Sequence, residues 1–205
     1  QGDVAENEDG MLRAATEKSR GVDKAVGGEV VGRMASIPLG GVGLTRGPSA
    51  TGKSHMGVAA ARTAVALGDE QTKVAMITPG NKQILGTVKR LCDDEGADRV
   101  NWIPSRSFME QEPTLVWSHP ASIFKKAMDC RNSSEDCSAL VALWNEVKHS
   151  RRAAEKERLW EKFDAKIRDV ILYFIGAPFF CCTLCTLPKI VAILGRSFDF
   201  AFVDE

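Results

Sequence analysis

The sequence lacks an excess of charge of either sign, because 27 lysine and arginine residues balance 27 aspartate and glutamate residues. Net charge therefore gives no indication of a nucleic-acid partner, although a local basic groove is compatible with the balance. The N-terminus also lacks the apolar core of a secretory signal, since it is polar and acidic from Gly2 to Gly10. With 44% apolar and 26% charged residues over 205 positions, the composition is that of one soluble globular domain.

The sequence lacks the cysteine spacing of a disulfide framework or a metal site, although it contains six cysteines. Three cysteines are scattered and three crowd into one apolar run: Cys92, Cys130 and Cys137, then Cys181, Cys182 and Cys185. The C-x-x-C pair in that run has no further zinc ligands at suitable spacing, and a redox pair would stand at a helix start. We expect free, buried core thiols in a reducing compartment, and hence an intracellular protein of the cytoplasm or nucleus.

Long hydrophobic runs are almost absent. Residues 170–187 are nearly free of charge and about as long as the shortest membrane-spanning helix. Gly176 and Pro178 interrupt them, so a buried helix end that leads into a buried strand is the preferred interpretation, and we expect no membrane partner.

Apolar spacing predicts alternating strands and helices. A helix is expected from Lys53 to Leu67, a strand over residues 73–78, a helix around residues 84–91 and a strand over residues 100–103. Further strands are expected over residues 179–183 and 198–203. This alternation predicts an α/β fold with a doubly wound parallel sheet flanked by helices.

The remaining segments are less regular. Residues 1–37 are a polar lead-in, predicted to be flexible, and residues 105–120 are predicted to be loop. A polar turn at residues 132–136 precedes one long helical pattern over residues 138–174, within a helical insertion at about 121–175. Its charged face is expected to be solvated, with a nucleic-acid contact as the alternative.

The sequence contains the full pattern of a phosphate-binding loop, G-x-x-x-x-G-K-S. Its residues are Gly47, Pro48, Ser49, Ala50, Thr51, Gly52, Lys53 and Ser54. Glycines let successive backbone N–H groups point at phosphate oxygens, and the helix that follows adds its positive end. Lys53 is expected to bind the β- and γ-phosphates of ATP and Ser54 to ligate Mg²⁺. The alternative is a glycine-rich turn without a ligand.

An acidic pair, Asp204-Glu205, follows the last predicted strand. A carboxylate at the end of a buried strand beside a phosphate loop can hold Mg²⁺, so we assign that role to Asp204. Glu205 is then positioned to orient the attacking water. The alternative is an acidic pair on the surface after a strand.

The segment Thr78-Pro79-Gly80-Asn81 stands where a strand gives way to a helix. Its backbone N–H groups could bind a phosphate, including one of a nucleic-acid backbone. The alternative is a helix cap in which Thr78 or Asn81 serves the free N–H groups.

Taken in order, GPSATGKS, VAMITPGNKQILGTVKRL, FFCCTL and FDFAFVDE resemble the first RecA-like domain of superfamily 1 helicases. The similar group includes the nonsense-mediated-decay RNA helicase and its senataxin relatives. The resemblance implies an ATP- and Mg²⁺-dependent helicase or translocase on single-stranded RNA or DNA. It places Thr78, Pro79, Asn81 and Thr183 on the nucleic acid, and it implies a second RecA-like domain that completes the ATP site. Ser49, Ala50 and Gly80 depart from the residues usual in this family.

Two other functions stay open from the residues alone. One is a P-loop NTPase of another class, such as a small-molecule kinase or an AAA-type motor. The other is a non-catalytic nucleotide-binding scaffold. Because the chain starts at Gln1 and stops directly after the acidic pair, we expect it to be a fragment, incomplete as a RecA-like domain and weak or inactive as an enzyme by itself.

Overall fold

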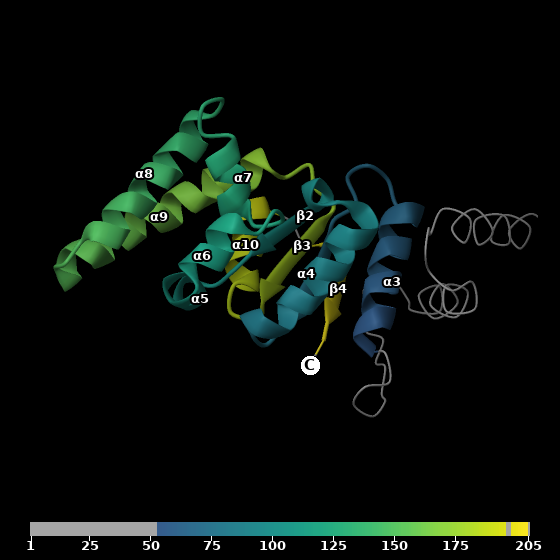
Figure 1. The fold of residues 1–205 in the computed structure, drawn as a ribbon. Coiled ribbons are helices and arrows are strands. Elements are labelled where there is room, and N and C mark those ends of the chain that lie inside the picture. Colours follow the sequence, from purple (N-terminus) through teal and green to yellow (C-terminus); the bar gives the residue numbers. More distant parts are fainter. Residues whose placement is uncertain (1–52, 196–197, 205) are drawn as a thin grey trace, which may run out of the picture.

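A parallel four-stranded sheet forms the centre of the molecule (Figure 1). The computed structural model describes residues 53–195 and 198–204. The strands are β1 (Val74–Thr78), β2 (Val100–Ile103), β3 (Phe179–Thr183) and β4 (Phe200–Val203), in the spatial order β2-β3-β1-β4. Every neighbouring pair is parallel, which confirms the predicted α/β class and parallel sheet.

The buried strands are the short apolar runs that the sequence pattern predicts. Each residue of β1, β2 and β3 is buried, as expected for strands covered on both faces. In register, Val74 lies beside Phe179 on one side and beside Phe200 on the other. Most of β4 is exposed, because it is an edge strand among the described residues.

Helices connect the strands, and a helix also precedes β1. The helices are α3 (Lys53–Leu67), α4 (Asn81–Glu95), α5 (Arg106–Gln111), α6 (Pro113–Ser118), α7 (Ile123–Asp129), α8 (Glu135–His149), α9 (Ala153–Tyr173) and α10 (Leu187–Leu194), with a 3₁₀ turn η1 (Ala97–Arg99). The predicted helix at Lys53 and the helix after Asn81 are confirmed. Because β1 to β2 and β3 to β4 step across the sheet in opposite directions, right-handed crossovers require α4 and α10 on opposite faces.

The predicted loop over residues 105–120 is wrong, because this segment forms the two short helices α5 and α6. Ser105 caps α5 by accepting the Phe108 N–H at 3.4 Å, and Pro113 stands in the first turn of α6. Phe108 and Val116 are buried and fix both turns to the core. The many polar residues between these anchors hide the helical spacing.

The single long helix predicted over residues 138–174 is also wrong. It is a hairpin of α8 and α9, which projects away from the sheet in Figure 1. Ser150 has extended backbone angles and ends α8, and α9 begins at Ala153. The apolar stripe folds back on itself, with Trp144 centred 6.1 Å from Trp160 and 6.2 Å from Phe163. Burial of these rings against one another stabilises the hairpin more than one extended helix would.

Residues 170–187 form the end of α9, a short connection, β3, a turn and the first residue of α10. The predicted order of a helix end and then a buried strand is confirmed, although Leu172 and Tyr173 at the helix end are exposed. Within the described residues, no helix combines the length and the apolar character that crossing a membrane requires.

Candidate functional site

The candidate site lies at the edge of the sheet where the parallel strands end. The Asp204 N–H donates to the Ile77 carbonyl oxygen at 2.9 Å, and the Leu184 N–H donates to the Thr78 carbonyl oxygen at 3.1 Å. The ends of β1, β3 and β4 therefore lie side by side. Helix α3 packs on β1 and β4, and its first turn lies toward this same edge (Figure 1). Ligands of parallel α/β sheets bind at such an edge.

Most of the phosphate-loop prediction lies outside the described residues. This applies to Gly47, Pro48, Ser49, Ala50, Thr51 and Gly52, to Glu205, and to the lead-in 1–37. Lys53 is the first residue of α3, and Ser54 is half-buried in the first turn. The phosphate loop stays a prediction, whereas the helix expected directly after it is present.

The turn after β1 does not contain the helix cap that the sequence offers as an alternative. Gly80 is the N-cap of α4, and neither Thr78 nor Asn81 serves its free N–H groups. The Thr78 hydroxyl donates to the Gly80 carbonyl oxygen at 2.8 Å, and Gln83 Oε1 accepts the Gly80 N–H at 3.0 Å. The cap prediction fails because both candidate side chains have other partners.

Asn81 joins the start of α4 to the start of α5. Its side-chain Nδ2 donates to Ser105 Oγ at 2.9 Å, and its Oδ1 accepts the Ser105 N–H at 3.2 Å. Asn81 is half-buried, and Pro79 beside it is exposed. Sequence reasoning misses Ser105 because it follows β2, which is not adjacent to β1 in the sheet.

Thr78 and Thr183, both predicted to face nucleic acid, are 1% and 2% exposed. The Thr183 hydroxyl lies 3.0 Å from the Thr186 hydroxyl, which fixes the turn after β3. Leu184 is 46% exposed, so the accessible surface here comes from the residues after each strand. The two threonines are buried beneath this surface, and their hydroxyls hold the turns that follow β1 and β3.

The C-x-x-C pair is divided between the core and the surface. Cys181 and Cys182 are buried in β3, and burial raises the pKa of both thiols, that of Cys182 to about 12. Cys185 is exposed, which corrects the expectation that the whole run is buried. All six cysteines are free thiols, as expected. Among the described residues no group of three or more histidine, cysteine or acidic side chains could hold a metal ion.

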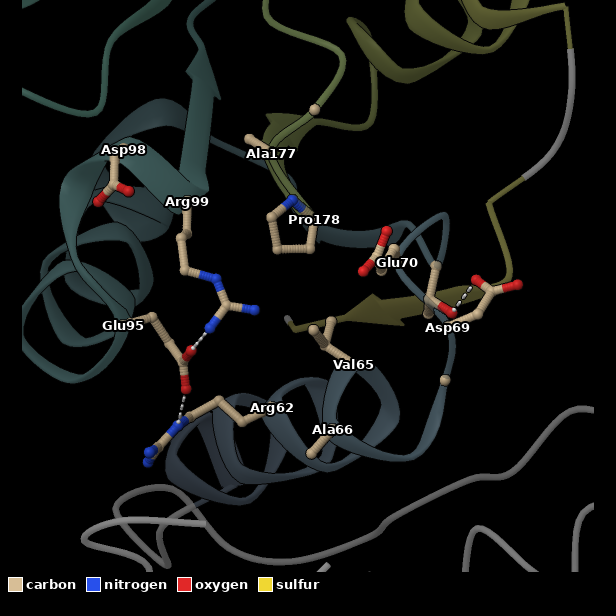
Figure 2. A pocket seen from close by; sticks show the side chains of 13 residues that line it. Arg62, Val65, Ala66, Asp69, Glu70, Glu95, Asp98, Arg99, Ala177 and Pro178 are labelled. Carbon is tan, nitrogen blue, oxygen red and sulfur yellow. Dashed lines mark hydrogen bonds and ion pairs between the residues drawn. The ribbon is translucent and has the colours of Figure 1, made fainter. Parts of the chain in front are cut away.

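A cavity of about 690 Å³ lies at the opposite edge of the sheet (Figure 2). Glu95 accepts from Arg62 Nε at 2.7 Å and from Arg99 Nη1 at 2.5 Å, so one carboxylate joins α3, α4 and η1. Pro178, which directly precedes β3, also lines this cavity. Strands begin here, so the cavity is separate from the candidate site and contains none of the predicted site residues.

Comparisons of the chain with protein-family models, with curated protein sequences and with solved structures found no match. The helicase resemblance therefore stays a hypothesis that rests on the sequence motifs.

Proposed function

We propose that this chain is the ATP-binding part of an ATP-dependent RNA or DNA helicase or translocase, with a RecA-like P-loop fold. The support is the complete G-x-x-x-x-G-K-S pattern of residues 47–54, followed at once by a helix, together with the order of the later motifs.

One structural observation carries the proposal: motifs far apart in the sequence converge on one edge of the sheet. Asp204 is joined by its backbone to Ile77, next to the turn at residues 79–81, and α3 packs against both strands. In the proposal, the phosphate loop that precedes α3 reaches this same edge, because the first turn of α3 lies toward it (Figure 1). If the loop pattern were a chance match, there would be no reason for an acidic residue such as Asp204 to lie at the same edge of the sheet as the start of α3.

The residues present fit a magnesium nucleotide by the chemistry of their donor groups. Ser54 supplies a hydroxyl and Asp204 a half-buried carboxylate, which are oxygen ligands of the kind that Mg²⁺ prefers. In the proposal Lys53 binds the β- and γ-phosphates, Ser54 and Asp204 hold the metal, and Glu205 orients water. When bound, ATP supplies the phosphoanhydride bond whose hydrolysis drives movement.

The proposed nucleic-acid partner is a single strand of RNA or DNA that crosses the surface beside Pro79 and Asn81. The half-buried Asn81 is held by Ser105, so a strand there would contact a rigid turn rather than a free side chain. Thr78 and Thr183 act in this proposal by shaping the turns, since both hydroxyls are buried. A second RecA-like domain is the proposed source of the remaining charge stabilisation.

The test is titration of the chain with a fluorescent ATP analogue, with and without Mg²⁺. We expect weak binding that requires Mg²⁺, and Lys53→Ala should lower the affinity at least about tenfold. Lys82→Ala removes an exposed lysine of α4 and is the matched control, with affinity unchanged.

Two results would count against the proposal. Binding that ignores both Mg²⁺ and Lys53→Ala, with both variants folded by circular dichroism, would favour a scaffold without a nucleotide site. Rapid ATP hydrolysis by these 205 residues alone, abolished by Lys53→Ala, would exclude the need for a second domain.

A further inference from the structure

A second cavity, of about 510 Å³, opens among α5, α9 and α10. It lies beyond the ends of β2 and β3, since Ile103 and Cys185 both line it. Its walls are mainly apolar and come from four elements: Met109, Phe124, Ile167, Ile171, Ile190 and Ile193. A cavity of this size and lining is suited to a small organic molecule.

The charged side chains around this cavity are mostly cationic. Arg106, Arg168 and Lys189 line it, whereas Asp164 is the only carboxylate in its described lining. The Arg106 guanidinium is already engaged, because it donates two hydrogen bonds to Glu157, at 2.9 and 2.7 Å.

The other two cations are available to a ligand. Lys189 lies 3.1 Å from Asp164, but both side chains are exposed, so water screens that ion pair. Arg168 is exposed and makes no ion pair within residues 53–195 and 198–204. One guanidinium and one ammonium group therefore stand beside an apolar cavity without a strong internal partner.

We propose that this cavity binds small organic anions that have an apolar body and a single phosphate, sulfonate or carboxylate group. The body occupies the apolar walls, and Arg168 and Lys189 bind the anionic group. Charge complementarity points to this class of ligand, because Arg168 and Lys189 stand beside apolar walls and Asp164 is the only carboxylate in the described lining. The inference concerns residues outside the proposed ATP site and does not rest on the proposed function.

Cys185 provides a natural reporter for this cavity. Its thiol is exposed and lines the cavity, whereas Cys181 and Cys182 are buried in β3. Cys130, at the end of α7, is half-buried and does not line the cavity, so it serves as the internal control. A ligand in the cavity should slow alkylation of Cys185 without affecting Cys130.

The experiment uses 8-anilinonaphthalene-1-sulfonate, an aromatic sulfonate, as the probe on the full chain. Its fluorescence gives the affinity, and mass spectrometry gives the iodoacetamide labelling rate of each cysteine. We expect saturating probe to lower the labelling rate of Cys185 at least about fivefold and to leave the labelling rate of Cys130 unchanged. The double variant Arg168→Gln/Lys189→Gln should bind about tenfold more weakly. Arg158→Gln, an exposed α9 position outside the cavity, is the matched control and should bind as the wild type does.

A measurement on the wild-type chain alone guards against misfolded variants. Arg168 and Lys189 should attract anionic iodoacetate, so its labelling rate relative to neutral iodoacetamide should be higher at Cys185 than at Cys130. Added salt should remove this difference. Probe binding without protection of Cys185, or equal affinity of the double variant, would overturn the proposal. Protection by a single-stranded oligonucleotide but not by the probe would overturn it too, and would assign the cavity to the nucleic-acid path.

Discussion

Asn81 and Ser105 are joined by two hydrogen bonds, and each residue stands at the start of a helix. The pair ties the turn after β1 to the turn after β2, two strands that are separated in the sheet by β3. Ser105 also caps α5, so the position of that helix depends on the same contacts.

Asn81→Ala should lower the free energy of unfolding by about 1–2 kcal/mol, because two partly buried hydrogen bonds are lost. Urea denaturation measures this loss, with Lys82→Ala as the control. A double-mutant cycle with Ser105→Ala should give a coupling energy of about 1 kcal/mol. Additive effects of the two substitutions would contradict the direct contact.

Arg62 should matter more for stability than Arg99, although both contact Glu95. Arg62 is 5% exposed and also binds Asp94 at 3.0 Å, whereas the Arg99 side chain is 44% exposed. Arg62→Met should cost about 2–3 kcal/mol, because it leaves the partly buried Glu95 with only an exposed partner. Arg99→Met should cost less than about 1 kcal/mol. Equal midpoint shifts in thermal unfolding would contradict this ranking.

Lys126 should make stability depend on pH in the alkaline range. Its ammonium group donates to the carbonyl oxygens of Asp98 and Val100 and to Asn101 Oδ1, and burial lowers its pKa from 10.5 to about 8. The nearby Asp98 carboxylate opposes this shift in pKa.

The sign of this pH dependence follows from proton binding. Between about pH 8 and 10.5 the unfolded chain holds the Lys126 proton and the folded chain does not. Stability of the wild type relative to Lys126→Met should therefore rise with pH across that range. Urea midpoints at several pH values test this, with Lys125→Met as the control for loss of a lysine from α7. A relative stability that falls as pH rises would refute the assignment.

Removal of magnesium should weaken nucleotide binding through Asp204. In the wild type, a chelator should lower nucleotide affinity about tenfold, and Asp204→Asn should lower it to a similar level even with Mg²⁺ present. Asp93→Asn, an exposed position of α4, is the control and should keep the full Mg²⁺ effect. An Asp204→Asn variant that responds to the chelator as the wild type does would show that Asp204 does not hold the metal.

The sheet is well predicted from the sequence because its buried strands are short, mostly apolar runs bounded by turn residues. Residues 74–78 and 179–183 need no knowledge of their neighbours to be recognised as buried strands. The α8–α9 hairpin could not be predicted in this way, because the connection at residues 150–152 contains no glycine or proline to mark a turn. Only the contact between Trp144 and Trp160 reveals that the apolar stripe turns back.

The candidate site is predictable in part. Parallel pairing follows from the alternation of elements, so the convergence of Thr78, Thr183 and Asp204 could be expected. The partners of the polar side chains could not. Asn81 hydrogen-bonds to Ser105, and the Thr183 hydroxyl lies within hydrogen-bond distance of the Thr186 hydroxyl. Both contacts depend on the geometry of turns that the packing of α5 and α10 determines.

The central place of β3 also determines the order in which the molecule can fold. β3 pairs with both β1 and β2, which do not pair with each other, and α5 to α9 precede it in the chain. During synthesis the α8–α9 hairpin can close over its short connection while β1 and β2 still lack β3 and β4, their neighbours among the described strands. Two apolar strands thus leave the ribosome long before the strand that joins them, and through that interval aggregation is the main competitor of folding.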